Sequence, residues 1–243
     1  MKSQIFNLII LDESGSMSCV TKQTISGCNE TINTIRSVQK KFAETQEHFV
    51  SIFAFQSEGD RPSRYIIKDE PIEKVKHITA EDYESYGSTP LYDAVGGTLT
   101  DLKTTAKRSE DAIGSVTIIT DGYENSSSRY TLEKVAKMIE ALKELGWNFN
   151  FIGTNIDVNE VSSSLNIDNA MAFEQDDAGT KAMFRKERRS RKAYYARIEE
   201  ANMEMNACMA APSAAEMSEE VIEELYEKRL ERRKNANKGY FNV

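Results

Sequence analysis

Apolar runs rich in β-branched residues alternate with longer helical stretches over residues 1–175, and this alternation constrains the fold more than any other feature of the sequence. The expected strands cover 4–11, 49–55, 64–68 (at an edge), 115–120, 147–152 and 170–173, and the expected helices cover 21–47, 90–107, 132–145 and 158–165. Strands that alternate with helices at this spacing predict a three-layer α/β fold. We expect a doubly wound, Rossmann-like, mainly parallel sheet with helices on both faces.

The pattern changes at residue 176, where we place a boundary between an α/β domain (1–175) and a C-terminal helical extension (176–243). A long helix is expected over 177–205 and a second over 216–234, with a break at the Ala-Ala-Pro-Ser of 210–213. The stretch 181–197 carries eight basic residues and a single acid, Glu187. The extension is therefore expected to present a strongly basic helix.

Acidic residues outnumber basic ones by 39 to 31, and the excess lies in residues 1–175. From Asp176 onward the chain has 14 basic and 13 acidic residues, which leaves 17 basic and 26 acidic ones, a formal charge of −9, before it. General nucleic-acid binding depends on Lys and Arg that neutralise phosphates. The acidic body therefore argues against nucleic acid as a partner.

The cysteines and the apolar runs bear on the compartment. Cys19, Cys28 and Cys208 are odd in number and form no CxxC pair, so they predict neither a disulfide framework nor a zinc site and favour a reducing, cytoplasmic setting. The apolar run 5–11 is far shorter than the roughly 20 residues of a membrane span and lacks a small-residue cleavage site. We therefore expect a buried strand there and no membrane association.

Oxygen-bearing side chains follow the first expected strand directly, in the segment Asp12-Glu13-Ser14-Gly15-Ser16. Alternate positions of this turn offer one carboxylate and two hydroxyls, which are hard ligands suited to Mg²⁺ or Mn²⁺. Gly15 allows the turn to fold tightly enough for both hydroxyls to face one point. The segment therefore offers three candidate ligands of a metal ion.

Two further oxygen ligands stand at other loop positions. Thr89 lies in a Gly-Ser-Thr-Pro turn before an expected helix, and Asp121 directly follows the strand 115–120. In a doubly wound sheet these loops emerge at the same edge as the segment after the first strand. We therefore expect Asp12, Ser14, Ser16, Thr89 and Asp121 to converge.

The stretches LDESGSMS, GSTPLYDAV and ITDGYEN resemble the metal-ion-dependent adhesion site (MIDAS) of von Willebrand factor A (vWA) domains, whose pattern is DxSxS, then Thr, then Asp. They look like the bacterial branch of that family, and the resemblance covers residues 4 to about 173. It implies a vWA fold in which Asp12, Ser14, Ser16 and Thr89 are direct or near-direct ligands and Asp121 acts directly or through water.

The resemblance also implies a non-catalytic role in protein binding. A site with only two carboxylates leaves Mg²⁺ electron-poor, so that one exchangeable position takes an Asp or Glu of a protein partner. In bacteria, cytosolic domains of this type often work beside AAA+ ATPases of the MoxR kind, or in stress-resistance and phage-defence operons with kinases and phosphatases. Such proteins are the partners that the resemblance implies.

Several alternatives remain open at the level of sequence. The turn at 12–16 could merely cap the following helix, with Ser16 or Ser18 as N-cap. A Mg²⁺-dependent phosphatase or hydrolase is a second alternative, although Ser14 stands where the haloacid-dehalogenase pattern has a second Asp. A third is nucleic-acid binding through the basic helix, with Tyr194 and Tyr195 available for stacking.

The acidic residues of the last expected helix leave one more question open. Glutamates between 219 and 227 could reach the metal, or they could pair along the helix, as in Glu224 with Lys228. The spacing of four residues favours the pairing within the helix.

Overall fold

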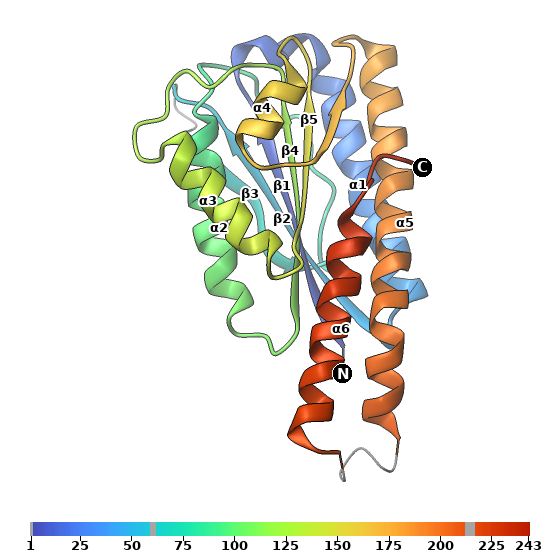
Figure 1. Cartoon of the computed structure of the whole chain (residues 1–243). Coiled ribbons are helices and arrows are strands. Elements are labelled where there is room, and N and C mark those ends of the chain that lie inside the picture. Colours follow the sequence, from blue (N-terminus) through green and yellow to red (C-terminus); the bar gives the residue numbers. More distant parts are fainter. Residues whose placement is uncertain (1, 59–61, 212–216) are drawn as a thin grey trace.

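The computed structural model describes residues 2–58, 62–211 and 217–243, and within them six strands form one sheet in the order β3-β2-β1-β4-β5-β6 (Figure 1). Neighbouring strands are parallel except β2 and β3, which are antiparallel. The predicted mainly parallel sheet with an edge strand at β3 is confirmed. The strands are β1 (Ser3–Asp12), β2 (Gln46–Phe55), β3 (Arg64–Pro71), β4 (Ala112–Thr120), β5 (Asn148–Gly153) and β6 (Asn169–Ala172).

Helices cover both faces of this sheet, so the three-layer α/β fold is confirmed (Figure 1). One face carries α2, α3 and α4, and the other carries α1, α5 and α6. A 3₁₀ turn, η1, leads from β1 into α1. The bounds are η1 (Gly15–Val20), α1 (Thr21–Lys41), α2 (Leu91–Ala106), α3 (Leu132–Lys143), α4 (Val158–Ser164), α5 (Asp177–Ala210) and α6 (Glu219–Asn237).

The central strand β1 contributes to the core on both sides. Successive side chains of a strand point to opposite faces. Accordingly Ile5 and Ile9 pack with α1 and α5, whereas Leu8 and Ile10 pack with α2 and α3. This two-sided burial explains why the strand is almost continuously apolar, as central parallel strands are.

The helix α5 is part of the core layer on the α1 face. Phe184, Tyr194 and Ile198 of α5 are buried in the same cluster as the side chains of β1 and α1. A Cβ on Gly27 of α1 would lie 2.0 Å from the Phe184 ring, so the two helices approach closely where Gly27 leaves room. The α6 helix then packs against α5, and Tyr240 beyond it is fully buried.

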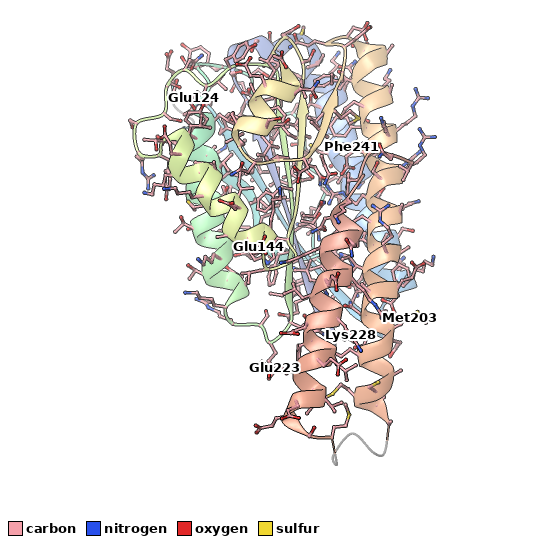
Figure 2. The ribbon with its side chains drawn as sticks, in the orientation of Figure 1. Glu124, Glu144, Met203, Glu223, Lys228 and Phe241 are labelled. Atoms are coloured by element: carbon pink, nitrogen blue, oxygen red, sulfur yellow. The ribbon has the colours of Figure 1, made fainter. Side chains whose placement is uncertain are left out.

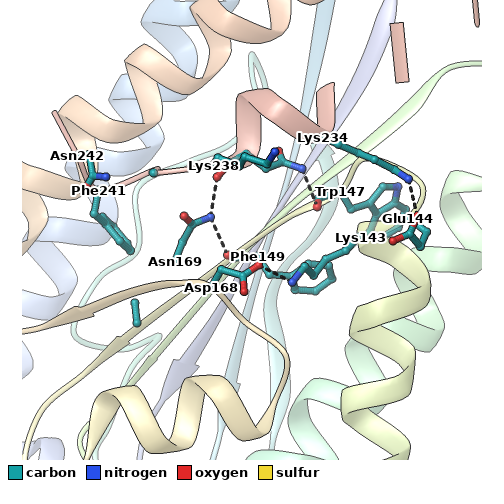
Figure 3. A pocket seen from close by; sticks show the side chains of 13 residues that line it. Lys143, Glu144, Trp147, Phe149, Asp168, Asn169, Lys234, Lys238, Phe241 and Asn242 are labelled. Carbon is teal, nitrogen blue, oxygen red and sulfur yellow. Dashed lines mark hydrogen bonds and ion pairs between the residues drawn. The ribbon is translucent and has the colours of Figure 1, made fainter. Parts of the chain in front are cut away.

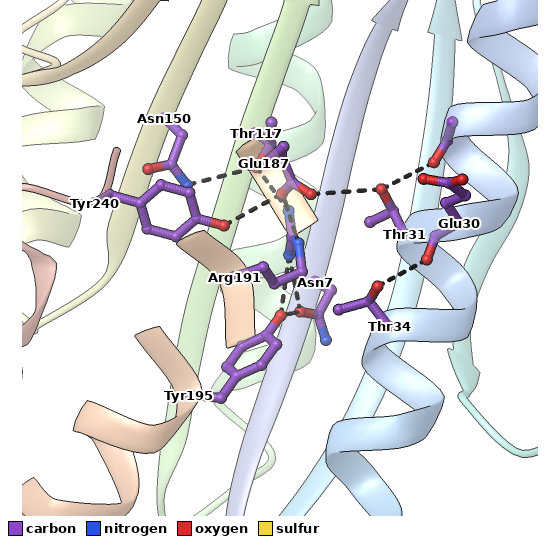
Figure 4. Close-up of polar contacts among 11 residues, drawn as sticks. Asn7, Glu30, Thr31, Thr34, Thr117, Asn150, Glu187, Arg191, Tyr195 and Tyr240 are labelled. Carbon is purple, nitrogen blue, oxygen red and sulfur yellow. Dashed lines mark hydrogen bonds and ion pairs between the residues drawn. The ribbon is translucent and has the colours of Figure 1, made fainter. Parts of the chain in front are cut away.

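A buried polar cluster joins α5 to the sheet (Figure 4). Arg191 is paired with Glu187 on the same helix at 2.5 Å, and both side chains are almost completely buried. The Arg191 guanidinium also donates to Thr117 of β4 at 2.9 Å and to Asn7 of β1 at 3.3 Å. The middle of α5 is therefore fixed to the two central strands by charge-assisted hydrogen bonds.

Some predicted boundaries are wrong. The helix expected over 21–47 ends at Lys41, and β2 begins at Gln46. The Phe42 amide still bonds to Val38, after which Gln46 and His48 alternate inward as strand residues. A helical and a strand period fit this short stretch equally well, and tertiary packing decides between them.

The two helices of the C-terminal region also differ from expectation. The first extends to Ala210 instead of ending at 205. The second begins at Glu219, where the Ser218 hydroxyl accepts a hydrogen bond from the amide of Val221 as an N-cap, and it continues to Asn237. Residue 216, at which the helix was expected to begin, and residues 212–213 of the expected break lie outside the described residues.

No helix within the described ranges combines the length and the apolar character that a membrane crossing requires.

Candidate metal centre

The loop after β1 is folded around the carboxylate of Asp12. Asp12 is the last residue of β1 and is fully buried. Its Oδ1 accepts a hydrogen bond from the amide of Ser14 at 2.7 Å, and its Oδ2 accepts one from the Thr120 hydroxyl at 2.6 Å. The central pair β1–β4 therefore holds Asp12 at the carboxyl edge of the sheet, where open α/β sheets place their ligand sites.

Ser14, Ser16 and Asp121 form a connected row of oxygens beside Asp12. The hydroxyls of Ser14 and Ser16 are 3.2 Å apart, and Ser16 donates to Asp121 Oδ1 at 2.7 Å across 105 residues of sequence. Ser14 and Asp121 are buried, whereas Ser16 is exposed. The row therefore opens to solvent on the side of Ser16.

Thr89 completes the set from a third loop. A Cβ added to Gly122 would lie 3.1 Å from Thr89 Oγ1, so Thr89 reaches the residue that follows Asp121. The Gly15 amide donates to the Gly87 carbonyl at 3.1 Å and joins the two loops directly. The Thr89 hydroxyl forms no hydrogen bond with the described part of the chain and is free to act as a ligand. The structure thus brings all five predicted residues to one edge.

The Asp12 carboxylate is buried beside the charge of Asp121. Burial, opposed by hydrogen bonds from Thr120 and Ser14 and reinforced by the nearby charge of Asp121, raises the pKa of Asp12 to about 6. Two carboxylates in one partly dry site repel each other. A cation between them would relieve both the repulsion and the cost of burying their charge.

The donor set fits a hard divalent cation. It consists entirely of oxygens, two carboxylates and three hydroxyls, and such ligands suit Mg²⁺ and Mn²⁺ rather than softer metals. Across residues 2–58, 62–211 and 217–243 there is no group of three or more His, Cys, Asp or Glu that could hold a metal ion. A site on this chain therefore depends on the hydroxyls as much as on the acids.

Several supporting residues were missed at the level of sequence. The Thr120 hydroxyl donates a hydrogen bond to Asp12. Its position directly before the predicted ligand Asp121 could have indicated that it lies at the site. Glu13 is fully buried and pairs with Arg64 at 2.6 Å, which holds the ligand loop against β3. Gln175 donates to Asp121 from a segment that carries no motif. A contact such as that between Gln175 and Asp121 depends only on how the folded chain brings the two segments together.

No family model and no curated protein matches this sequence, whereas solved structures do match its fold. A von Willebrand factor type A protein from Catenulispora acidiphila gives a TM-score of 0.51 at 16% identity and covers 79% of this chain. The manganese-loaded TRAP protein of Plasmodium vivax gives 0.50 at 19% identity and covers 74% of this chain and 72% of its own. Proximal thread matrix protein 1 from the mussel byssus, with a zinc-occupied MIDAS motif, gives 0.51 at 11% identity and covers 76% of this chain and 47% of its own.

Likeness at these identities shows the fold. The strand order, the helix layers and these structural neighbours define an α/β protein with the fold of a von Willebrand factor type A domain, as the motifs had indicated. The chain spans 43% of the length of the Catenulispora structure that it matches.

A separate cavity of about 550 Å³ lies between the β5–β6 side of the sheet and the end of α6 (Figure 3). Trp147, Phe149 and Phe241 contribute apolar surface to it. Of the lysines at its rim, Lys143 pairs with Asp168 at 2.6 Å, and Lys234 pairs with Glu144. The first pair joins α3 to the segment before β6, and the second joins α6 to the end of α3, so these charges are compensated within the chain.

Proposed function

We propose that this chain is a non-catalytic, metal-dependent protein-binding module. One observation carries the proposal: the Ser16 hydroxyl contacts Asp121 while Thr89 reaches the next residue, so three loops distant in sequence place five oxygen donors together. The fold supports the proposal because matched structures include a manganese-loaded protein and one with a zinc-occupied MIDAS motif.

Each side chain has a defined task in this proposal. Asp12 supplies buried negative charge, Ser14, Ser16 and Thr89 supply neutral oxygens, and Asp121 ligates directly or orients a water. The bound metal, Mg²⁺ or Mn²⁺, supplies an electrophilic position that takes a carboxylate. The exposure of Ser16 leaves the site accessible from outside. The partner is therefore a protein that offers an Asp or Glu.

The setting of this activity is part of the proposal. Cys19, Cys28 and Cys208 are all free, which supports a reducing, cytoplasmic compartment. A MoxR-type AAA+ ATPase, or a kinase or phosphatase of a stress or defence operon, is the partner class that the family resemblance suggests.

Two alternatives lose support from the structure. Tyr194 and Tyr195 are fully buried, so neither is available to stack on nucleic acid. Glu224 pairs with Lys228 at 2.7 Å, as the spacing predicted. Figure 2 shows Glu223 and Lys228 at the end of the molecule opposite Glu124, which lies near the candidate metal edge. The acidic face of α6 therefore does not reach the metal of its own chain.

Metal binding is tested first, by calorimetric titration of Mn²⁺ and Mg²⁺ into the wild type, Ser16→Ala and Ser18→Ala. We expect Ser16→Ala to bind at least about tenfold more weakly, whereas Ser18→Ala, an exposed serine two residues away, matches the wild type. Equal affinity of all three proteins would refute the site. Ser16→Ala is preferable to Asp12→Ala because Asp12 is buried and hydrogen-bonded, so its removal also disturbs folding.

Partner binding is tested second, by pull-down from lysate of the source cell in Mg²⁺ and in EDTA with the same three proteins. A partner retained only in Mg²⁺, and only by the wild type and Ser18→Ala, is the expected result. A partner that binds equally in EDTA would place the binding surface elsewhere on the chain.

A further inference from the structure

The segment between β6 and α5 sends one side chain into the candidate metal site. The Gln175 amide nitrogen donates to Asp121 Oδ2 and also to the backbone carbonyl of Ser16, at 3.0 Å. Its two acceptors lie 54 and 159 residues away in sequence. Gln175 therefore joins the end of β4 to the ligand loop after β1.

The orientation of this amide is fixed from its other end. Asn155, in the turn between β5 and α4, donates from its side-chain nitrogen to Gln175 Oε1. Asn155 has a φ of 57°, a left-handed conformation that Asn tolerates better than most residues. With its oxygen used by Asn155, Gln175 can only present its nitrogen to Asp121.

The backbone around Gln175 is equally constrained. The Phe173 amide bonds to the Gly153 carbonyl at 3.0 Å, as a continuation of the β5–β6 pairing. The Asp176 side chain accepts from the Gly179 amide at 2.6 Å and caps the first turn of α5. A Cβ on Gly179 would lie 2.2 Å from the Glu174 carbonyl oxygen, so the turn is closely packed. Gln175 thus extends from a rigid corner.

We propose that Gln175 is a positioning residue of the metal site, which holds Asp121 and the Ser16 loop in the geometry that binds the ion. This inference rests on the proposed function. Asp121 Oδ1 receives the Ser16 hydroxyl and Oδ2 receives Gln175, so the carboxylate is oriented through both oxygens. A lysine here would neutralise the site and displace the cation, and an alanine would free the carboxylate. A neutral amide donor orients Asp121 and leaves its charge for the metal.

Two consequences distinguish this role from simple packing. Loss of an outer contact to a metal ligand weakens metal affinity by about 10- to 100-fold, so Gln175→Ala binds Mn²⁺ at least about tenfold more weakly. Gln175→Glu places a third carboxylate beside Asp121, so it lowers Tm without metal and enlarges the rise in Tm that Mn²⁺ produces.

The experiment titrates Mn²⁺ into the wild type, Gln175→Ala, Gln175→Glu and a matched control, Gln23→Ala. Gln23 is half-buried on α1, and its side chain forms no hydrogen bond with the described residues. Hydrogen exchange of residues 173–180 is followed with and without Mn²⁺. We expect Mn²⁺ to slow exchange there in the wild type and in Gln23→Ala, but not in Gln175→Ala.

Each outcome decides the inference. Gln175→Ala that binds Mn²⁺ like the wild type, while Ser16→Ala does not, overturns the role of Gln175 and leaves the proposed function standing. Faster exchange of 173–180 on Mn²⁺ binding also overturns it, because the metal would then displace Gln175. A wild type that takes up no Mn²⁺ overturns both.

Discussion

Glu13, between two candidate ligands, is a buried carboxylate whose charge is compensated by one arginine. Arg64 donates to both of its oxygens, at 2.6 and 3.1 Å, and Arg64 itself is 27% exposed. Breaking a fully buried pair costs about 3–5 kcal/mol, and the partial exposure of Arg64 reduces this. We predict that Glu13→Gln lowers the free energy of unfolding by about 2 kcal/mol in urea denaturation. Glu84→Gln, at an exposed neighbour, is the control, and an equal loss in both variants would contradict the prediction.

His48 makes stability depend on pH. Its burial, and then the charge of Arg191, lower the pKa of His48 from 6.5 to about 3. The neutral ring contacts Gln46 at 3.1 Å, Asn7 at 3.4 Å and the Tyr195 ring. Between pH 6.5 and 3 the unfolded chain binds this proton and the folded chain does not. The stabilisation is therefore complete above pH 6.5 and is lost as pH falls, by at most about 1.4 kcal/mol per pH unit.

The check is a series of urea melts between pH 7 and 4.5. We expect His48→Gln to show a shallower loss of stability than the wild type. His77→Gln, at an exposed histidine, should retain the wild-type slope. Parallel slopes for wild type and His48→Gln would contradict the assignment.

The residues of the candidate site divide into those that a sequence can indicate and those that it cannot. Asp12 ends β1 and Asp121 directly follows β4, so strand prediction alone brings them to one edge of the sheet. The burial of Glu13 was not predictable, because it depends on Arg64. This residue lies on the edge strand β3, which runs antiparallel to β2. Gln175 was equally hidden, since its contact with Asp121 is set by the corner that begins α5.

At the scale of elements, α5 depends on the buried Arg191–Glu187 pair. Arg191→Met leaves the buried Glu187 carboxylate without a cation, with the hydroxyls of Tyr240 and Thr31 as its remaining donors. We predict a loss of about 3–5 kcal/mol in the free energy of unfolding. The double variant Glu187→Leu/Arg191→Met removes both charges and should be more stable than Arg191→Met alone. Chemical denaturation of the wild type, Arg191→Met, Glu187→Leu and the double variant measures the coupling energy between the two side chains. A double variant less stable than Arg191→Met would show that the contacts of Glu187 with the hydroxyls of Tyr240 and Thr31 outweigh the cost of its unpaired charge.

The prediction of helices and strands succeeded where apolar residues fill both faces of a strand and failed where the buried residues are polar. The strands β4 and β5 were placed nearly at their true positions, because Ile and Phe fill both faces. The end of α1 was misplaced because Gln46 and His48 are polar, yet they are buried through hydrogen bonds with Gln39 and with each other. The spacing of apolar residues cannot reveal a polar residue that is buried because its hydrogen bonds are made within the protein.

At the scale of the whole molecule, the C-terminal helices and the sheet form one core. Residues of α5 and the segment after α6 pack in the same cluster as β1 and α1, which includes Phe184, Tyr195 and Tyr240. We predict that a chain ended at residue 175 does not unfold cooperatively, because it exposes that apolar face together with the polar side chains of Asn7 and Thr117. Scanning calorimetry and the dispersion of NMR chemical shifts test this prediction. A truncated chain with a sharp melt and unchanged Mn²⁺ affinity would contradict it.

The direction of β1 has a practical consequence for tethering the molecule. The strand begins at Ser3, next to the amino end, and finishes at Asp12 on the opposite edge (Figure 1). Ten extended residues span roughly 33 Å, so an attachment at the amino end stands about that far behind the ligand loop. A chain immobilised by this end on a bead or sensor surface therefore orients its Asp12 edge away from the support.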